Sequence, residues 1–68
     1  MNRRVQASHL EVGNVFYHST EPEKEYIVQK VDFRYGKVIA KQYIHGEPYG
    51  KNVYFSRGAT YYYLIGNH

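Results

Sequence analysis

The sequence predicts an all-β fold. The clearest evidence is the stretch from Tyr26 to Phe55, where short runs of alternating apolar and polar residues are separated by glycine-containing turns. The chain has no apolar pattern with a 3.6-residue period that lasts longer than two helical turns. It also contains nine Tyr among its 68 residues, and Tyr is a good strand former.

Length and composition limit how such a fold can be stabilised. A chain of 68 residues forms one domain and buries only roughly 60% of the surface that its unfolded form exposes. It has no Cys, which excludes disulfides and thiolate metal sites. We expect the tyrosine rings to supply much of the core in place of aliphatic side chains. Formation of a homodimer is the other expected way to bury more surface.

The first elements are expected as follows. Residues 1–8 are predicted to form a flexible basic arm, and residues 9–66 to form the folded domain. The segment LEVGNVFY at 10–17 predicts a first strand, which a turn or bulge at Gly13 interrupts. The polar segment HSTEPEKE at 18–25 predicts a loop.

The next strand is predicted over residues 25–33. Tyr26 and Val28 would point to one face of a regular strand, and Val31 and Phe33 to the opposite face. A bulge near Gln29–Lys30 is therefore needed to bring all four side chains inward.

Further strands are predicted over 38–44, 51–56 and 61–65. A tight connection at 34–37 places Gly36 in a left-handed conformation, and residues 45–50 contain two Gly and one Pro, which predicts a turn. A single 3₁₀ turn is expected at 56–60, before the last strand.

A register can be inferred for the three-stranded meander. If Phe33 pairs with Val38, and Ile44 with Lys51, the inner face is mostly apolar and carries Val31, Phe33, Val38, Ala40, Val53 and Phe55. The outer face then aligns Lys30, Lys41 and Tyr54 in one row. Directly opposed like charges disfavour a sheet. Either the register is therefore shifted by two residues, or the outer face is meant for an anion.

The order of these elements resembles that of the SH3-like small β-barrels, particularly the KOW and Tudor-like branches. The segments that carry the resemblance are VGNVF at 12–16, YIVQKV at 26–31, KVIAK at 37–41 and YFSRGATYY at 54–62. The resemblance covers residues 10–65 and implies a five-stranded barrel with a short 3₁₀ turn before the last strand. Barrels of this kind serve as docking modules for nucleic acid or protein. The ALYDY and WW-type residues of peptide-binding SH3 domains are missing here.

Catalysis, cofactors and a membrane span are not expected. The histidines at 9, 18, 45 and 68 fit no standard zinc spacing, and there is no nucleophile elbow, P-loop or Gly-rich dinucleotide motif. No apolar run approaches the roughly 20 residues needed to cross a bilayer, and no signal-peptide pattern is present. We therefore expect a non-enzymatic, cytoplasmic binding protein without a cofactor.

The charge is unevenly distributed. Residues 1–29 carry three basic and four acidic side chains, whereas residues 30–68 carry six basic and two acidic ones. A local positive field of this kind captures polyanions, although a solvated surface of mixed charge is the simpler interpretation. Lys and Arg neutralise phosphates, and Tyr rings stack on unpaired bases. The expected nucleic-acid site comprises Lys30, Arg34, Lys37, Lys41, Tyr43, Lys51, Tyr54 and Arg57.

The alternative partner is a larger protein complex. Exposed Tyr gives amphipathic contact area at low entropic cost and is enriched in binding patches. The expected protein-binding residues are Tyr17, Tyr35, Tyr61, Tyr62 and Tyr63. If the last strand formed an exposed edge, two chains could also pair through it.

Overall fold

The described residues fold into one antiparallel sheet of six strands. The computed structural model describes residues 3–32, 34–56 and 61–67, with only the backbone at 67. In chain order the elements are β1 (Arg3–Gln6), the 3₁₀ helix η1 (Ala7–His9), β2 (Asn14–His18), β3 (Tyr26–Asp32), β4 (Lys37–Ile44), β5 (Glu47–Ser56) and β6 (Tyr61–Asn67). The strand order in the sheet is β1-β6-β2-β3-β4-β5. The predicted all-β class is therefore confirmed.

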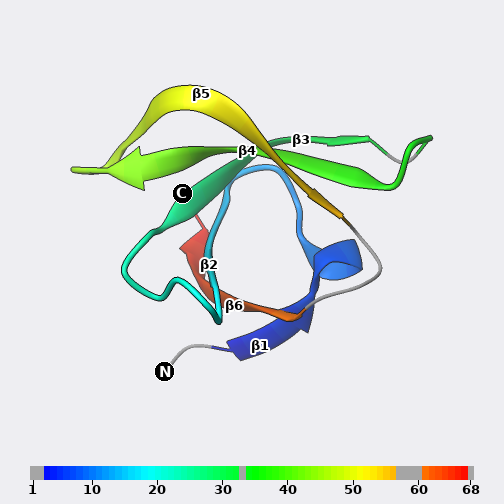
Figure 1. The fold of residues 1–68 in the computed structure, drawn as a ribbon, viewed down its shortest axis with the longest axis horizontal. Coiled ribbons are helices and arrows are strands. Elements are labelled where there is room, and N and C mark those ends of the chain that lie inside the picture. Colours follow the sequence, from blue (N-terminus) through cyan, green and yellow to red (C-terminus); the bar gives the residue numbers. More distant parts are fainter. Residues whose placement is uncertain (1–2, 33, 57–60, 68) are drawn as a thin grey trace.

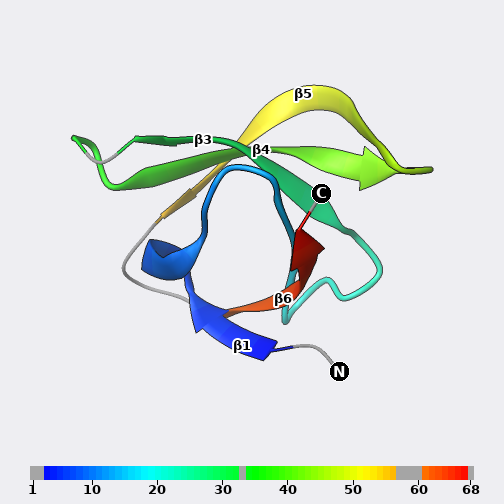
Figure 2. The ribbon, with the colours of Figure 1, turned by 180° about the vertical axis from the view of Figure 1, so that it is seen from behind.

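The sheet is strongly curled but remains open. Figures 1 and 2 show β3, β4 and β5 arching over β2, β6 and β1. Strands β1 and β5 are the two edges and do not pair with each other. Shifts of register in the β2–β6, β3–β4 and β4–β5 pairs mark bulges, which bend strands. The predicted five-stranded SH3-like barrel is therefore wrong, because the sheet has a sixth strand and does not close.

The additional strand comes from the N-terminal segment. Residues 1–8 are expected as a flexible arm, yet Arg3–Gln6 pairs with β6 and Ala7 is buried. Val5 lies in the core while Arg4 and Gln6 are exposed, which is the alternation of a strand with one buried face. A single apolar residue among polar ones is too short a pattern to reveal such a strand. The predicted 3₁₀ turn at 56–60 lies largely outside the described residues, and Ser56 itself belongs to β5.

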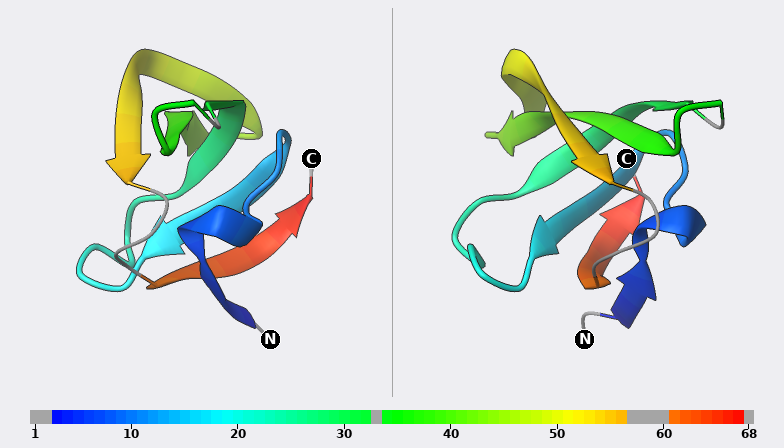
Figure 3. Two further views of the ribbon diagram at one scale, coloured as in Figure 1. Left: turned by 90° about the vertical axis from the view of Figure 1, so that its right-hand side faces the viewer. Right: turned by 45° about the vertical axis from the view of Figure 1, so that its right-hand side comes forward.

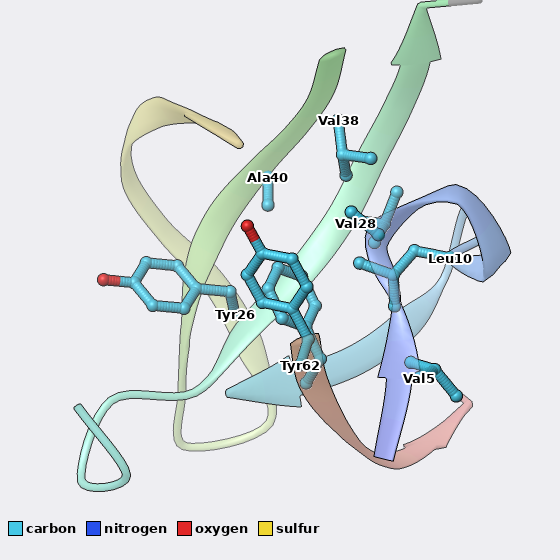
Figure 4. Close-up of a cluster of buried hydrophobic side chains, with 9 residues drawn as sticks. Val5, Leu10, Tyr26, Val28, Val38, Ala40 and Tyr62 are labelled. Carbon is cyan, nitrogen blue, oxygen red and sulfur yellow. The ribbon is translucent and has the colours of Figure 1, made fainter. Parts of the chain in front are cut away.

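The core lies between the two halves of the curled sheet. Its buried members are Val5, Ala7, Leu10, Phe16, Tyr26, Val28, Val38, Ala40 and Tyr62, and several are drawn in Figure 4. Phe16 is fully buried, and its ring centroid lies 5.8, 5.3 and 5.4 Å from those of Tyr26, Phe55 and Tyr62. These rings come from four strands, so tyrosine does replace aliphatic residues at the centre of the core.

The predicted inner face of the meander is confirmed for most of its members. Val38 and Ala40 are fully buried, and Val31, Val53 and Phe55 are partly buried against the core. Phe33 lies outside the described residues.

The predicted bulge in the third segment is also present. The register between β3 and β4 shifts between Val28 and Lys30, so Gln29 is the additional residue of β3. This shift lets Val28 and Val31 both face the core although their parities differ.

The predicted register of the meander is wrong, by two residues at Val38 and by four at Ile44, which pairs with Glu47 and not with Lys51. Val38 pairs with Val31 and with Phe55. The row that contains Lys30 and Tyr54 therefore passes through Ile39, and no lysine stands opposite Lys30.

For β4 and β5, the difference begins at the turn that joins them, and the bulge between Ala40 and Gln42 reduces it to two residues. Only His45 and Gly46 form this turn, and both have positive φ, 52° and 79°. Two such residues make the type I′ turn, whose twist matches that of a tight hairpin. Glu47–Gly50 therefore belong to β5 and not to the expected six-residue turn.

The connection between β3 and β4 has the predicted glycine conformation, but Lys37, which was expected within it, belongs to β4 and pairs with Asp32. Gly36 has a φ of 64°, the left-handed conformation expected for it. Oδ1 of Asp32 accepts hydrogen bonds from the backbone N–H groups of Arg34 and Tyr35, at 3.0 and 3.2 Å. This Asp side chain thereby fixes the start of the turn.

Candidate nucleic-acid interface

The outer face of the sheet is the face turned away from the core cluster. Because successive residues of a strand point to opposite faces, the neighbours of buried Val38 and Ala40 lie on the outer face of β4. Two rows cross the meander there. One contains Lys30, Ile39 and Tyr54, and the other contains Asp32, Lys37 and Ser56.

Basic and aromatic side chains gather at the end of the β3–β4 hairpin and on the adjacent part of β5. We call this group the hairpin tip, and it consists of Lys30, Arg34, Tyr35, Lys37 and Tyr54. All five side chains are exposed, with Tyr35 at 67% and Tyr54 at 61%. Figures 1 and 3 show that this hairpin extends beyond the body of the curled sheet. A large partner can therefore reach these residues without contacting the rest of the molecule.

One carboxylate lies within this group. Asp32 stands opposite Lys37 on the outer face, and its Oδ1 is held by the two backbone N–H groups of the turn. Arg34 contributes a charge beside an aromatic face, with its Cζ 5.7 Å from the centroid of the Tyr35 ring. The hairpin tip therefore has three basic side chains and one neighbouring carboxylate, which already accepts two backbone hydrogen bonds.

The other predicted nucleic-acid residues do not join the hairpin tip. Lys41 is half-buried next to Ile27, which is itself buried on the outer face. Tyr43 pairs with Pro48 near the opposite end of β4, and its N–H donates to the carbonyl oxygen of Glu25 at 2.7 Å.

Two further members of the predicted set remain. Lys51 is exposed in the irregular part of β5, where the register shifts opposite Ala40–Gln42. Arg57 lies outside the described residues. The eight-residue site is therefore reduced to four members that the fold brings together, and Tyr35 adds to them.

The predicted protein-binding tyrosines separate into three locations. Tyr17 and Tyr63 stack on the outer face of β2 and β6, with ring centroids 5.1 Å apart and an interplanar angle of 16°. Tyr61 is half exposed on the same face, and Tyr35 belongs to the hairpin tip. Tyr62 is only 2% exposed and packs in the core, so its prediction as a binding residue is wrong. Because side chains alternate along β6, Tyr62 points inward while Tyr61 and Tyr63 point outward.

Arg4 is a surface residue that the sequence analysis missed. It pairs with Tyr63 across the β1–β6 ladder, and its Cζ lies 4.7 Å from the centroid of the Tyr61 ring. We call Arg4, Tyr17, Tyr61 and Tyr63 the tyrosine face. No local pattern could have revealed Arg4, because its place on the solvent side of β1 depends on the pairing of this strand with β6.

The acidic loop between β2 and β3 offers no free cation. Nζ of Lys24 lies 3.2 Å from Oε2 of Glu21, and both side chains are exposed. This hydrogen bond and the charge of Glu21 raise the pKa of Lys24 above its ordinary value. Lys24 is therefore an exposed lysine whose charge is already balanced by an ion pair with Glu21.

Metal-binding clusters and pockets are absent from the described residues. These residues contain no group of three or more His, Asp or Glu side chains arranged to hold a metal ion, and they enclose no pocket. Within the same ranges no helix is long and apolar enough to cross a membrane. In comparison with known proteins, the chain matches no family model, no curated protein and no solved structure.

Proposed function

We propose that this protein is a small non-catalytic module that binds nucleic acid through the hairpin tip. The observation that carries this proposal is the grouping of Lys30, Arg34, Lys37 and the exposed ring of Tyr35 on one extended hairpin, with the exposed ring of Tyr54 beside them on β5. The cations neutralise phosphates and release condensed counterions. The rings stack on unpaired bases, each worth roughly 1–3 kcal/mol. The module acts in the cytoplasm and needs no cofactor.

The test is a titration of labelled single-stranded and duplex oligonucleotides over a series of salt concentrations. The expected result is binding that weakens steeply as salt rises, because each phosphate contact contributes about −0.7 to the slope of log K against log salt for a single strand. Lys37→Ala is expected to make the slope shallower by about that amount.

A matched control separates a specific contact from the loss of charge alone. Lys24→Ala removes the same charge from an exposed lysine that is paired with Glu21, away from the hairpin tip. It is expected to leave the salt slope unchanged. Undetectable binding at low salt, or equal effects of the two substitutions, contradicts the proposal.

A second candidate function rests on the tyrosine face. Its stacked Tyr17–Tyr63 pair and the Arg4–Tyr61 contact resemble the aromatic and Arg anchors of protein interfaces. If a protein is the partner, its binding survives nuclease treatment, is lost on Tyr61→Ala, and is unaffected by Lys37→Ala. The opposite pattern of sensitivity favours the hairpin tip and nucleic acid.

A further inference from the structure

The open edge of β5 has backbone groups whose direction can be worked out. Alternate residues of an antiparallel strand direct both their N–H and C=O groups to the same neighbour. On β4, the N–H of Tyr43 donates toward β3, to the oxygen of Glu25. Residues 37, 39 and 41 therefore also bond toward β3, and Val38 and Ala40 bond toward β5.

The same alternation applies to β5. Val53 and Phe55 pair with Ala40 and Val38, so their backbone groups are used by β4. Tyr54 and Ser56 stand opposite Ile39 and Lys37, and their N–H and C=O groups consequently point to the open edge. Among the described strands, none lies on that side of β5.

The two halves of β5 differ in how this edge is protected. In the first half, the hydrogen-bonded pair Ile44–Glu47 closes the hairpin, and Pro48 is the next residue. The backbone nitrogen of Pro48, which carries no hydrogen, therefore faces the open edge. Gly50 follows with a φ of 81°, at the shift of register. Proline and bulges are devices that prevent edge pairing. The segment 52–56 contains neither proline nor a charged residue.

We propose that a second copy of this chain pairs with segment 52–56 of β5, antiparallel and about a two-fold axis at Tyr54. In this register Tyr54 faces Tyr54 of the second copy, and Asn52 faces Ser56 of the second copy. Asn52, Tyr54 and Ser56 are alternate residues of β5, and all three direct their backbone N–H and C=O groups to the open edge. Each facing pair therefore exchanges two hydrogen bonds. The occupant is a second copy because the segment is complementary to itself in this register.

The side chains favour this register as well. Val53 faces Phe55 of the second copy on the inner side of the joined sheet, and both are only partly buried in the single chain. Their contact extends the apolar core and places no like charges opposite each other within 52–56. A chain of 68 residues without Cys has few other means to bury more surface.

The YYYLI strand cannot serve this purpose. It is β6, and it lies between β1 and β2 inside the sheet. The condition for pairing through residues 61–65, an exposed last strand, is therefore not met, and β5 is the strand that can accept a second copy.

The dimer also bears on ligand binding, a consequence that rests on the proposed function. Pairing Tyr54 with its own copy keeps the outer faces of both chains on the same side of the joined sheet. The two Tyr54 side chains then meet at the centre of one continuous surface with a hairpin tip on each side. A longer single strand is expected to bind across both tips.

The test is the mass of the free protein, measured by sedimentation over the micromolar to millimolar range without nucleic acid. The mass is expected to rise toward that of two chains. Ser56→Pro removes the outward N–H without removing a bond to β4, and it is expected to keep the protein monomeric. Ser56→Ala retains the N–H and is expected to dimerise like the original chain.

Amide hydrogen exchange gives a second readout that needs no substitution. The amides of Tyr54 and Ser56 are expected to become protected as concentration rises. A monomer at millimolar concentration, a dimer that persists in Ser56→Pro, or dimerisation without protection of these amides overturns the proposal. Because no ligand is present, none of these results depends on whether the protein binds nucleic acid.

Discussion

Truncation of Phe16 is expected to remove much of the stability of this fold. Phe16 is fully buried and its ring contacts those of Tyr26, Phe55 and Tyr62. Replacing a buried Phe by Ala costs about 3–5 kcal/mol, and aromatic pairs add roughly 0.5–1.5 kcal/mol each beyond the buried area. A domain of this length has a total stability of about 3–10 kcal/mol. Phe16→Ala is therefore expected to leave a large fraction of the chain unfolded.

Phe16→Leu gives a measurable form of the same prediction. Leu retains most of the buried apolar volume but loses the ring contacts, so we expect a cost of about 2 kcal/mol. This corresponds to a decrease in Tm of about 8–16 °C for a domain of this size. The assay is urea unfolding followed by far-ultraviolet circular dichroism, analysed by linear extrapolation.

The control for this measurement is an exposed apolar residue. Val12 is 64% exposed, so Val12→Ala is expected to change the free energy of unfolding by less than about 0.5 kcal/mol. If Phe16→Leu has an effect as small as this control, the aromatic cluster does not hold the two halves of the sheet together. A changed dependence on urea concentration would instead indicate an altered unfolded state.

Two further predictions concern a turn and the tyrosine face. Gly46→Ala is expected to destabilise the protein by about 1–2 kcal/mol, because the φ of 79° is strained for any residue with a Cβ, whereas the nearest atom to that Cβ, the Tyr43 hydroxyl oxygen at 4.0 Å, is at ordinary contact distance. Gly66→Ala is the control in thermal unfolding, because its Cβ would meet nothing within 4 Å and Gly66 has no positive φ. A double-mutant cycle on Tyr17 and Tyr63, each changed to Ala, is expected to give a coupling energy of about 0.5–1.5 kcal/mol for the stacked pair. A coupling near zero would show that the stack contributes no stability.

Local patterns predicted most of the strands but not the way in which they assemble. The segments that became β3 and β4, the bulge at Gln29 and the conformation of Gly36 all follow from rules that act within a few residues. The register between β4 and β5 depended on the turn at His45–Gly46. Its two positive φ angles permit a shorter connection than the Gly and Pro content of 45–50 indicated.

The sixth strand depended on a contact between the two ends of the chain. Arg3–Gln6 pairs with Tyr61–Leu64, and the local sequence around Val5 carries no sign of this distant partner. The presence of this strand is also why the closed five-stranded barrel was wrong.

The candidate site was predictable only where it lay on one hairpin. Lys30, Arg34 and Lys37 flank a turn of the predicted kind, so their proximity follows from the sequence. Tyr54 joins them through the observed register of β5. Tyr62 could not be separated from its neighbours in a run of three tyrosines, because the parity of β6 is set by its pairing with β2 and β1.

The position of β6 has a consequence for the order in which the sheet can assemble. Residues 61–67 fill the space between β1 and β2, and β1 has no other neighbour among the described strands. Strands β2 through β5 can pair before these residues are in place, but β1 cannot attach and Val5 cannot pack against Tyr62. Contacts between segments far apart in the sequence also slow folding. We therefore expect a chain truncated before residue 61 to be susceptible to proteases along β1, and the chain that carries β6 to fold in a single cooperative step.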